Sequence, residues 1–142
     1  MQIKKIRPGA KTPRRGSEYA AGSDLFACLD APMTIAPHDT AMIPTGLAIA
    51  LPSNTFGAVF ARSGLAVREG LRPANCVGVI DEDYRGELTV ALYNDSGTDR
   101  IIEPGERIAQ LVVLPYIMPD FEVVDALDQT ARGKDGFGST GK

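Results

Sequence analysis

Apolar residues along the chain fall in short runs separated by glycine, proline and asparagine, a pattern typical of β-strands. The runs predict strands at residues 3–6, 25–29, 41–43, 47–51, 58–60, 88–93 and 108–114. Only residues 65–69 offer a helical turn, because no stretch of about 11 residues between helix breakers carries apolar positions at helical spacing. The fold class is therefore all-β. Strands this short and numerous usually close into a barrel or a two-sheet jelly roll, since closure removes exposed strand edges.

An acidic stretch, GVIDEDYRGE at residues 78–87, interrupts this pattern. Val79 and Ile80 continue a short strand that begins at residue 77, and residues 88–93 are predicted to return from the turn as its hairpin partner. Asp81 then lies where strand becomes turn. A carboxylate held by rigid backbone and partly desolvated suits a general base. A solvated acidic turn is the simpler alternative on this pattern alone.

Length and charge narrow the class of protein. The 142 residues suffice for one domain with its own core, and a net charge of −3 provides no overall basic field for nucleic acid or an acidic membrane. The N-terminus lacks the apolar run of a secretory signal, and no apolar stretch is long enough to cross a bilayer. We expect a cytoplasmic protein that binds neither nucleic acid nor membrane.

The sequence gives little support for catalysis or metal binding by histidine or cysteine. His38 is the single histidine and lies in a predicted surface turn, so neither a catalytic triad nor a multi-histidine metal site can be built. Cys28 and Cys76 lack CxxC spacing. We expect both to be small apolar residues with free thiols, in a reducing compartment.

An anion-binding pattern follows the strand predicted at 58–60. Arg62, Ser63 and Gly64 open the helical turn, where a guanidinium, a hydroxyl and backbone N–H groups can hold an anion. An ordinary cap by Ser63 is an equal alternative, since capping uses the same groups. The basic residues Lys11, Arg14 and Arg15 nearer the N-terminus are expected in a solvated loop.

Polar residues also interrupt two apolar segments. Asp24 begins a strand after two small residues, a position where an acid is commonly structural. Arg107 and Gln110 stand in the run predicted as the last strand. Polar groups there need partners, so we predict a structural ion pair for Arg107.

After residue 124 the core pattern stops, and residues 125–142 are polar and rich in glycine. We expect a core of residues 1–124 and a flexible C-terminal segment, 125–142, of the same domain. A disordered end is the default expectation. The alternative is a lid, because Arg132 and unhindered N–H groups can close over an anion while Phe137 stacks on a base.

Five blocks occur in one order, namely AGSDL (21–25), ARSGLA (61–66), NCVGVIDEDYRGE (75–87), GERIAQL (105–111) and RGKDGFGSTG (132–141). Together they resemble the five motifs of the trimeric dUTPases and span nearly the whole chain. Asp135 departs from the glycine more usual in the last motif. The resemblance implies a homotrimer of jelly-roll-like, distorted β-barrels with a flexible glycine-rich C-terminal tail, in which three subunits build each site.

The resemblance further implies hydrolysis of dUTP to dUMP and pyrophosphate with Mg2+, which limits uracil in DNA and supplies dUMP for thymidylate synthesis. Asp81 is then the general base for water attack at the α-phosphorus, and Asp24 reaches the metal through water. Tyr84 packs under the deoxyribose, and the Asn75 amide matches the donor and acceptor edge of uracil. The implied substrate-binding residues are Arg62, Ser63, Gly64, Asn75, Val79, Ile80, Tyr84, Thr89, Gln110, Arg132, Phe137, Ser139 and Thr140.

Two alternatives remain open. A dCTP deaminase shares this fold, although such chains are typically longer and lack a GFGSTG-type lid. A non-catalytic nucleotide sensor on the same scaffold would have no need of the carboxylate of Asp81. Release of pyrophosphate from dUTP and from dCTP distinguishes the three.

Overall fold

The structure, a computed structural model, describes residues 1–134 and confirms the all-β fold class. One π-helical turn, η1 (Leu65–Glu69), occupies the position predicted for a helical turn. The strands are β1 (Gln2–Lys5), β2 (Arg14–Arg15), β3 (Ser23–Phe26), β4 (Met33–Ile35), β5 (Thr40–Pro44), β6 (Leu47–Ala50), β7 (Thr55–Phe60), β8 (Leu71–Pro73), β9 (Gly78–Ile80), β10 (Thr89–Asn94), β11 (Arg100–Ile102) and β12 (Arg107–Pro115).

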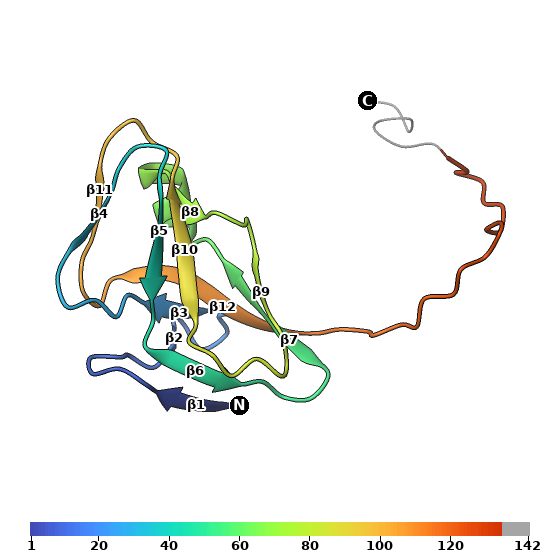
Figure 1. The fold of residues 1–142 in the computed structure, drawn as a ribbon, viewed down its shortest axis with the longest axis horizontal. Coiled ribbons are helices and arrows are strands. Elements are labelled where there is room, and N and C mark those ends of the chain that lie inside the picture. The colour runs from blue at the N-terminus through green and yellow to red at the C-terminus, as the bar shows by residue number, and fades with distance from the viewer. Residues whose placement is uncertain (135–142) are drawn as a thin grey trace.

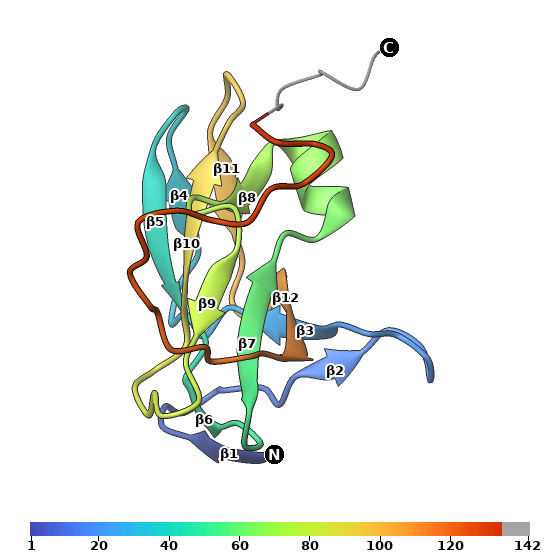
Figure 2. The same ribbon diagram turned by 90° about the vertical axis from the view of Figure 1, so that its right-hand side faces the viewer.

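The strands pair antiparallel in four sheets (Figure 1). The largest has the order β2-β3-β12-β7-β9, and a second has the order β5-β10-β8. The pairs β1-β6 and β11-β4 complete the set. Figure 2 shows β5 and β10 on the left and β7 and β12 on the right. One apolar cluster draws on both of these sheets, because alternate residues of their strands point inward.

The predicted hairpin between residues 77–80 and 88–93 is wrong. β9 pairs with β7, with Ile80 opposite Gly57, whereas β10 pairs with β5 and β8 in another sheet. Gly57 makes the first pairing possible, since an added Cβ would lie 3.2 Å from the Cβ of Ile80 and 3.1 Å from Cδ1 of Leu111. Burial decides the second pairing, because the alternating pattern of β10 buries Val90 and Leu92. Residues 81–88, here named the acidic loop, therefore cross from one sheet to the other.

Glu87 fastens the end of the acidic loop to the N-terminal segment. Its carboxylate accepts two hydrogen bonds of 2.7 Å from the Arg7 guanidinium and one of 2.9 Å from the Gly46 N–H. The Tyr84 hydroxyl donates to the Glu87 carbonyl at 3.0 Å. Hydrogen bonding from Arg7 lowers the pKa of the Glu87 carboxyl below its ordinary value of 4.5. The charged form of Glu87 is thus the form that holds the loop.

The Glu87 contact predicts a pH-dependent contribution to stability. A lowered folded pKa means that the contribution is complete above the unfolded pKa and disappears as the pH falls through the folded pKa. We expect Glu87→Gln to lower the melting temperature by about 2 °C at pH 7, since the pair is partly solvated. The difference from the unmodified chain should shrink below pH 4.5, the ordinary value of the carboxyl. Thermal unfolding followed by circular dichroism measures both.

Glu18→Gln provides the control, because it makes the same change of charge on an exposed residue. Its effect on the melting temperature should be smaller and should not follow the same pH profile. A difference for Glu87→Gln that stays constant down to pH 3 would contradict the assignment.

Candidate active site

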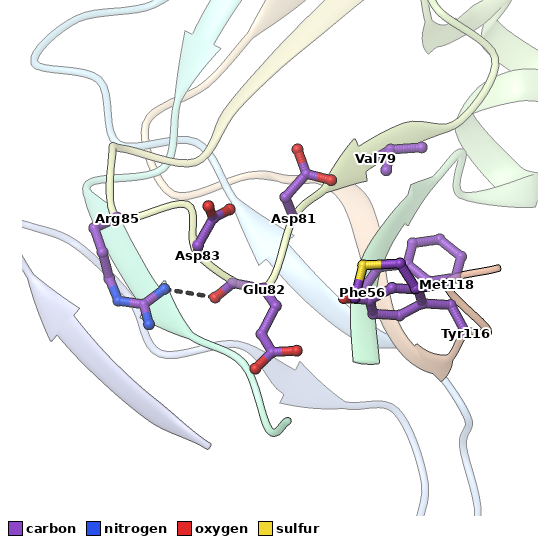
Figure 3. A pocket seen from close by; sticks show the side chains of 8 residues that line it. All are labelled: Phe56, Val79, Asp81, Glu82, Asp83, Arg85, Tyr116 and Met118. Atoms are coloured by element: carbon purple, nitrogen blue, oxygen red, sulfur yellow. Dashed lines mark hydrogen bonds between the residues drawn. The ribbon is translucent and has the colours of Figure 1, made fainter. Parts of the chain in front are cut away.

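Asp81 follows β9 directly and lies on the rim of a cavity of about 720 Å3 (Figure 3). Phe56, Tyr116 and Met118 group together on another part of the wall. The ring of Tyr116 meets that of Phe56 edge-on, with centroids 6.4 Å apart and planes at 82°. The cavity thus combines an apolar wall with carboxylates, as a pocket for an uncharged ring beside a reacting centre requires.

Backbone hydrogen bonds shape the acidic loop around Asp81. The Tyr84 N–H donates to the Asp81 carbonyl at 3.1 Å and closes a turn. Nη1 of Arg85 donates to the carbonyl of Glu82 at 2.6 Å and to that of Tyr84 at 2.9 Å. The Glu82 carboxylate accepts from the Asn54 N–H at 2.8 Å. Asp81 itself is exposed, so the partial desolvation expected from sequence is not met by this chain alone.

A second group of polar residues surrounds a cavity of about 380 Å3 at another place in the fold. Asp24 accepts from Nε of Arg62 at 2.9 Å through Oδ1 and from Nη1 of Arg107 at 3.3 Å through Oδ2. The structural ion pair predicted for Arg107 is confirmed. Ser63, Gly64 and Gln110 line the same cavity, which we call the phosphate corner together with Asp24, Arg62 and Arg107. Paired cations, a hydroxyl and an amide suit an oligophosphate.

Strand register assembles the phosphate corner. Gln110 on β12 lies opposite Asp24 on β3 and opposite Phe60 on β7, so the three side chains share a face. Nε2 of Gln110 donates to the Ala61 carbonyl at 2.9 Å. Gly22 leaves room for this amide, since an added Cβ would lie 2.6 Å from Oε1 of Gln110.

Ser63 does not serve as the helix cap. The N-cap of η1 is Gly64, which has a φ of −62°, and no side chain caps the turn by a hydrogen bond. The capping alternative is therefore wrong. Ser63 is exposed in the phosphate corner, where its hydroxyl can meet a ligand.

The residues expected to bind the nucleoside lie around β9 and the acidic loop. Asn75 is exposed before β9. Gly78 keeps that place open, because an added Cβ would lie 3.5 Å from Nδ2 of Asn75 and 3.2 Å from Cβ of Val59. Val79 is 62% exposed, whereas Ile80 packs against the core.

Tyr84 and Thr89 lie further along the chain. Tyr84 covers Gly86, where an added Cβ would collide with the tyrosine hydroxyl. Thr89 begins β10 and is exposed.

The structure does not bring Asp81 and the phosphate corner together in one chain. Ile80 pairs with Gly57, so Asp81 lies beside the start of β7, whereas Arg62 follows the end of β7 at Phe60. The four steps from Phe56 to Phe60 span roughly 13 Å of extended backbone. The two groups therefore form separate half-sites at opposite ends of one strand.

The C-terminal segment leaves the body of the protein after β12 (Figure 1). Residues 116–134 form neither strand nor helix, and Arg132 is exposed. Phe137, Ser139 and Thr140, expected to complete the lid, lie outside the described residues. Within residues 1–134 no helix has the length and apolar character needed to cross a membrane.

The single histidine and both cysteines line neither the Asp81 cavity nor the phosphate corner. His38 is exposed in a turn with a φ of 61°, as predicted. Both thiols are free. Cys28 is partly buried and its Sγ donates to the Pro8 carbonyl at 3.3 Å. Cys76 is exposed at a φ of 62°, so the expectation of a small apolar residue fails there because the turn before β9 lies on the surface.

Sequence reasoning missed Phe56, Tyr116 and Met118 as wall residues of the Asp81 cavity. Phe56 lies before the run predicted at 58–60, which is shorter than the observed β7, and the other two follow the predicted last strand. The pairing of Thr55 with Pro115 brings them together. An aromatic residue at the start of one strand and another just past the end of its partner is the signal that could have found them.

Comparison with known proteins identifies the family of this chain. The dUTPase family model matches residues 9–141. A deoxyuridine 5'-triphosphate nucleotidohydrolase of Desulfitobacterium hafniense is 53% identical over 132 residues, which cover 92% of this chain and 87% of that protein. Its counterpart in Burkholderia multivorans is 47% identical over 131 residues, covering 92% and 88%. Among solved structures, a G164S mutant of the Staphylococcus bacteriophage 80alpha dUTPase with dUpNHpp is similar at a TM-score of 0.90 and 28% identity, over 99% of this chain and 98% of that one. The chain therefore belongs to the dUTPase family.

Proposed function

We propose that this chain is a dUTP diphosphatase that hydrolyses dUTP to dUMP and pyrophosphate. This activity limits uracil incorporation into DNA and supplies dUMP for thymidylate synthesis. The observation that carries the proposal is the presence, in a chain of this family, of a guanidinium-rich phosphate corner together with an exposed carboxylate beside an apolar pocket. These are the two chemistries that the hydrolysis of a nucleoside triphosphate requires.

Asp81 acts as the general base. Its backbone is fixed by β9 on one side and by the Tyr84 turn on the other, so the carboxylate is directed by rigid structure. It accepts a proton from the water that attacks the α-phosphorus in line, and pyrophosphate leaves. The charge that develops on the phosphates is stabilised by Arg62, Ser63, Gln110, Arg132, Ser139 and Thr140.

The active site is shared among the subunits of a homotrimer. The separation of the half-sites along β7 means that the Asp81 of one subunit serves the phosphate corner of another. The exposed apolar residues that follow β12 support association, since a monomer leaves them in water. They include Ile117, Met118, Phe121, Val123 and Leu127. A jelly-roll-like, distorted barrel of residues 1–124 forms the core of each subunit, and residues 125–142 form the lid.

The residues present fit magnesium that arrives on the nucleotide. Within residues 1–134 no cluster of three or more carboxylate, thiol or imidazole side chains forms a metal cage. Asp24 already accepts hydrogen bonds from Arg62 and Arg107, so it would hold a metal only through water. Mg2+ suits this arrangement because it keeps several waters and binds phosphates directly. When bound, it draws charge from the pyrophosphate group.

Substrate choice separates dUTP hydrolysis from its alternatives. If Asn75 and Tyr84 bind the base and the sugar as proposed, pyrophosphate should be released from dUTP and far more slowly from dCTP and UTP, because a cytosine edge and a 2′-hydroxyl do not fit these contacts. Pyrophosphate release with each of the three nucleotides is the measurement. Ammonia release from dCTP would indicate a deaminase instead, and binding without any release would indicate a sensor. Equal rates on UTP would refute the role of Tyr84.

Replacement of the proposed base tests the mechanism. We expect Asp81→Asn to lower kcat by roughly 10²–10⁴-fold, since an amide keeps the shape of the side chain but cannot accept the proton. The affinity for a non-hydrolysable imido analogue of dUTP should stay within about threefold, a change too small to reflect a lost charged contact. Asp83→Asn is the matched control, because Asp83 lines the same cavity without adjoining β9. Similar losses of kcat in both variants would show that Asp81 is not the general base.

Truncation after Ala131 tests the lid. It removes Arg132, Phe137, Ser139 and Thr140 but no strand, so the melting temperature should stay within about 2 °C. Turnover should nearly vanish, and kcat should fall more than affinity, because a lid that excludes water acts mainly in the transition state.

Two further variants refine the lid test. Deletion of Lys142 alone keeps the RGKDGFGSTG block intact and should leave turnover unchanged. Phe137→Ala removes only the stacking contact and should cost about 1–3 kcal/mol of nucleotide affinity. Full turnover in the chain truncated after Ala131 would show that residues 132–142 are not a lid.

A further inference from the structure

The phosphate corner continues onto β2. A cavity of about 360 Å3 is lined by Arg14, Arg15, Gly16, Asp24, Phe26 and Arg107. Gly16, Asp24 and Arg107 also line the phosphate corner. The two cavities therefore adjoin along the same three residues, and Arg14 stands on the far side of this shared boundary.

Register places the Arg14 side chain toward the phosphate corner. Arg14 on β2 lies opposite Asp24 on β3, and Asp24 lies opposite Gln110 on β12. Directly opposed residues of antiparallel strands share one face of the sheet, with Cβ atoms about 4.5–5.5 Å apart. Arg14, Asp24 and Gln110 thus form one row across three strands. Arg15 lies opposite Ser23, one position along, and its side chain starts on the other face.

The row together with its neighbours Arg62 and Arg107 carries more positive than negative charge. Asp24 is its one carboxylate, and both oxygens accept hydrogen bonds from Arg62 and Arg107. Arg14 adds a third guanidinium, which is exposed to solvent. The cation of Lys11 lies 5.5 Å from the ring centroid of Phe26 on the same wall. A chain with a net charge of −3 therefore concentrates cations at this corner.

Protection of the sheet edge against pairing with other chains does not by itself explain the position of Arg14. β2 is an edge strand, and charged residues there hinder pairing with other chains. Any exposed charge would serve that purpose, on either face. Arg14 and Arg15 both line the cavity with Arg107, but only Arg14 shares a row with Asp24 and Gln110.

We propose that Arg14 forms an outer anion subsite that holds the pyrophosphate group, either as the distal phosphates of the bound nucleotide or as the released product. The inference deepens the proposed hydrolysis of dUTP and rests on it for the identity of the ligand. Arg14 thereby lengthens the phosphate corner beyond Arg62 and Ser63. A nucleoside monophosphate, which lacks the outer phosphates, does not reach it.

Isothermal titration calorimetry on the full chain tests the subsite with three probes, namely inorganic pyrophosphate, a non-hydrolysable imido analogue of dUTP, and dUMP. Arg14→Gln should weaken binding of the analogue about fivefold and leave binding of dUMP unchanged, consistent with loss of one solvated charged contact. Weaker binding of pyrophosphate by a similar factor assigns the subsite to the product as well. Loss with the analogue alone assigns it to the bound nucleotide. Arg14→Lys should recover most of the affinity, since the point charge is retained.

Lys5→Gln supplies the matched control, because it removes the same charge from β1 in a different sheet. If Lys5→Gln and Arg14→Gln weaken binding of the phosphate probes equally, the effect comes from net charge alone. That result would overturn the subsite. Unchanged binding of both phosphate probes to Arg14→Gln would overturn it too. An unmodified chain that fails to hydrolyse dUTP would overturn the proposed function, while pyrophosphate titrations of the same variants would still decide the role of Arg14.

Discussion

The register of β12 between β3 and β7 is the constraint on which the rest of the structure depends. Asp24, Gln110 and Phe60 align across the three strands, and this row alone brings the acid of one motif to the amide of another. A shift of the β12 register by one residue would point Gln110 into the core and would point a buried apolar neighbour toward the phosphate corner. The buried Ala109 and Leu111 on either side of it prevent that shift, because each would have to face water.

A β-bulge completes the same row. The register of β12 against β3 shifts between Arg107 and Ala109, and Ile108 and Ala109 are both buried in succession. A bulge redirects the side chain at its edge. Arg107 can therefore reach Asp24 at 3.3 Å although it stands in a strand of otherwise apolar character. The carboxylate that orders Arg62 thus orders Arg107 as well, and one acid holds two cations beside each other.

Sequence alone predicted the features that depend on local pattern. Seven strand segments, the turn at residues 65–69 and the ion pair of Arg107 follow from apolar runs and from a charge placed within one. β2, β4, β8 and β11 were missed, because each has only two or three residues and no apolar run of its own. The hairpin of residues 77–80 was wrong for a different reason. β9 packs closely against Gly57 of β7, which lies more than twenty residues away and carries no side chain to signal the pairing.

Attachment of both half-sites to β7 also has a genetic consequence. In the proposed homotrimer with shared sites, a substitution of Asp81 and a substitution of Arg62 damage half-sites at opposite ends of the same strand. Each mutant subunit therefore still carries one intact half-site. Two defective alleles expressed together can then assemble some complete sites from complementary halves. A single defective allele mixed with the normal one leaves a fraction of the sites intact for the same reason. In the proposed trimer, the inheritance of such defects would thus follow from the length of one six-residue strand.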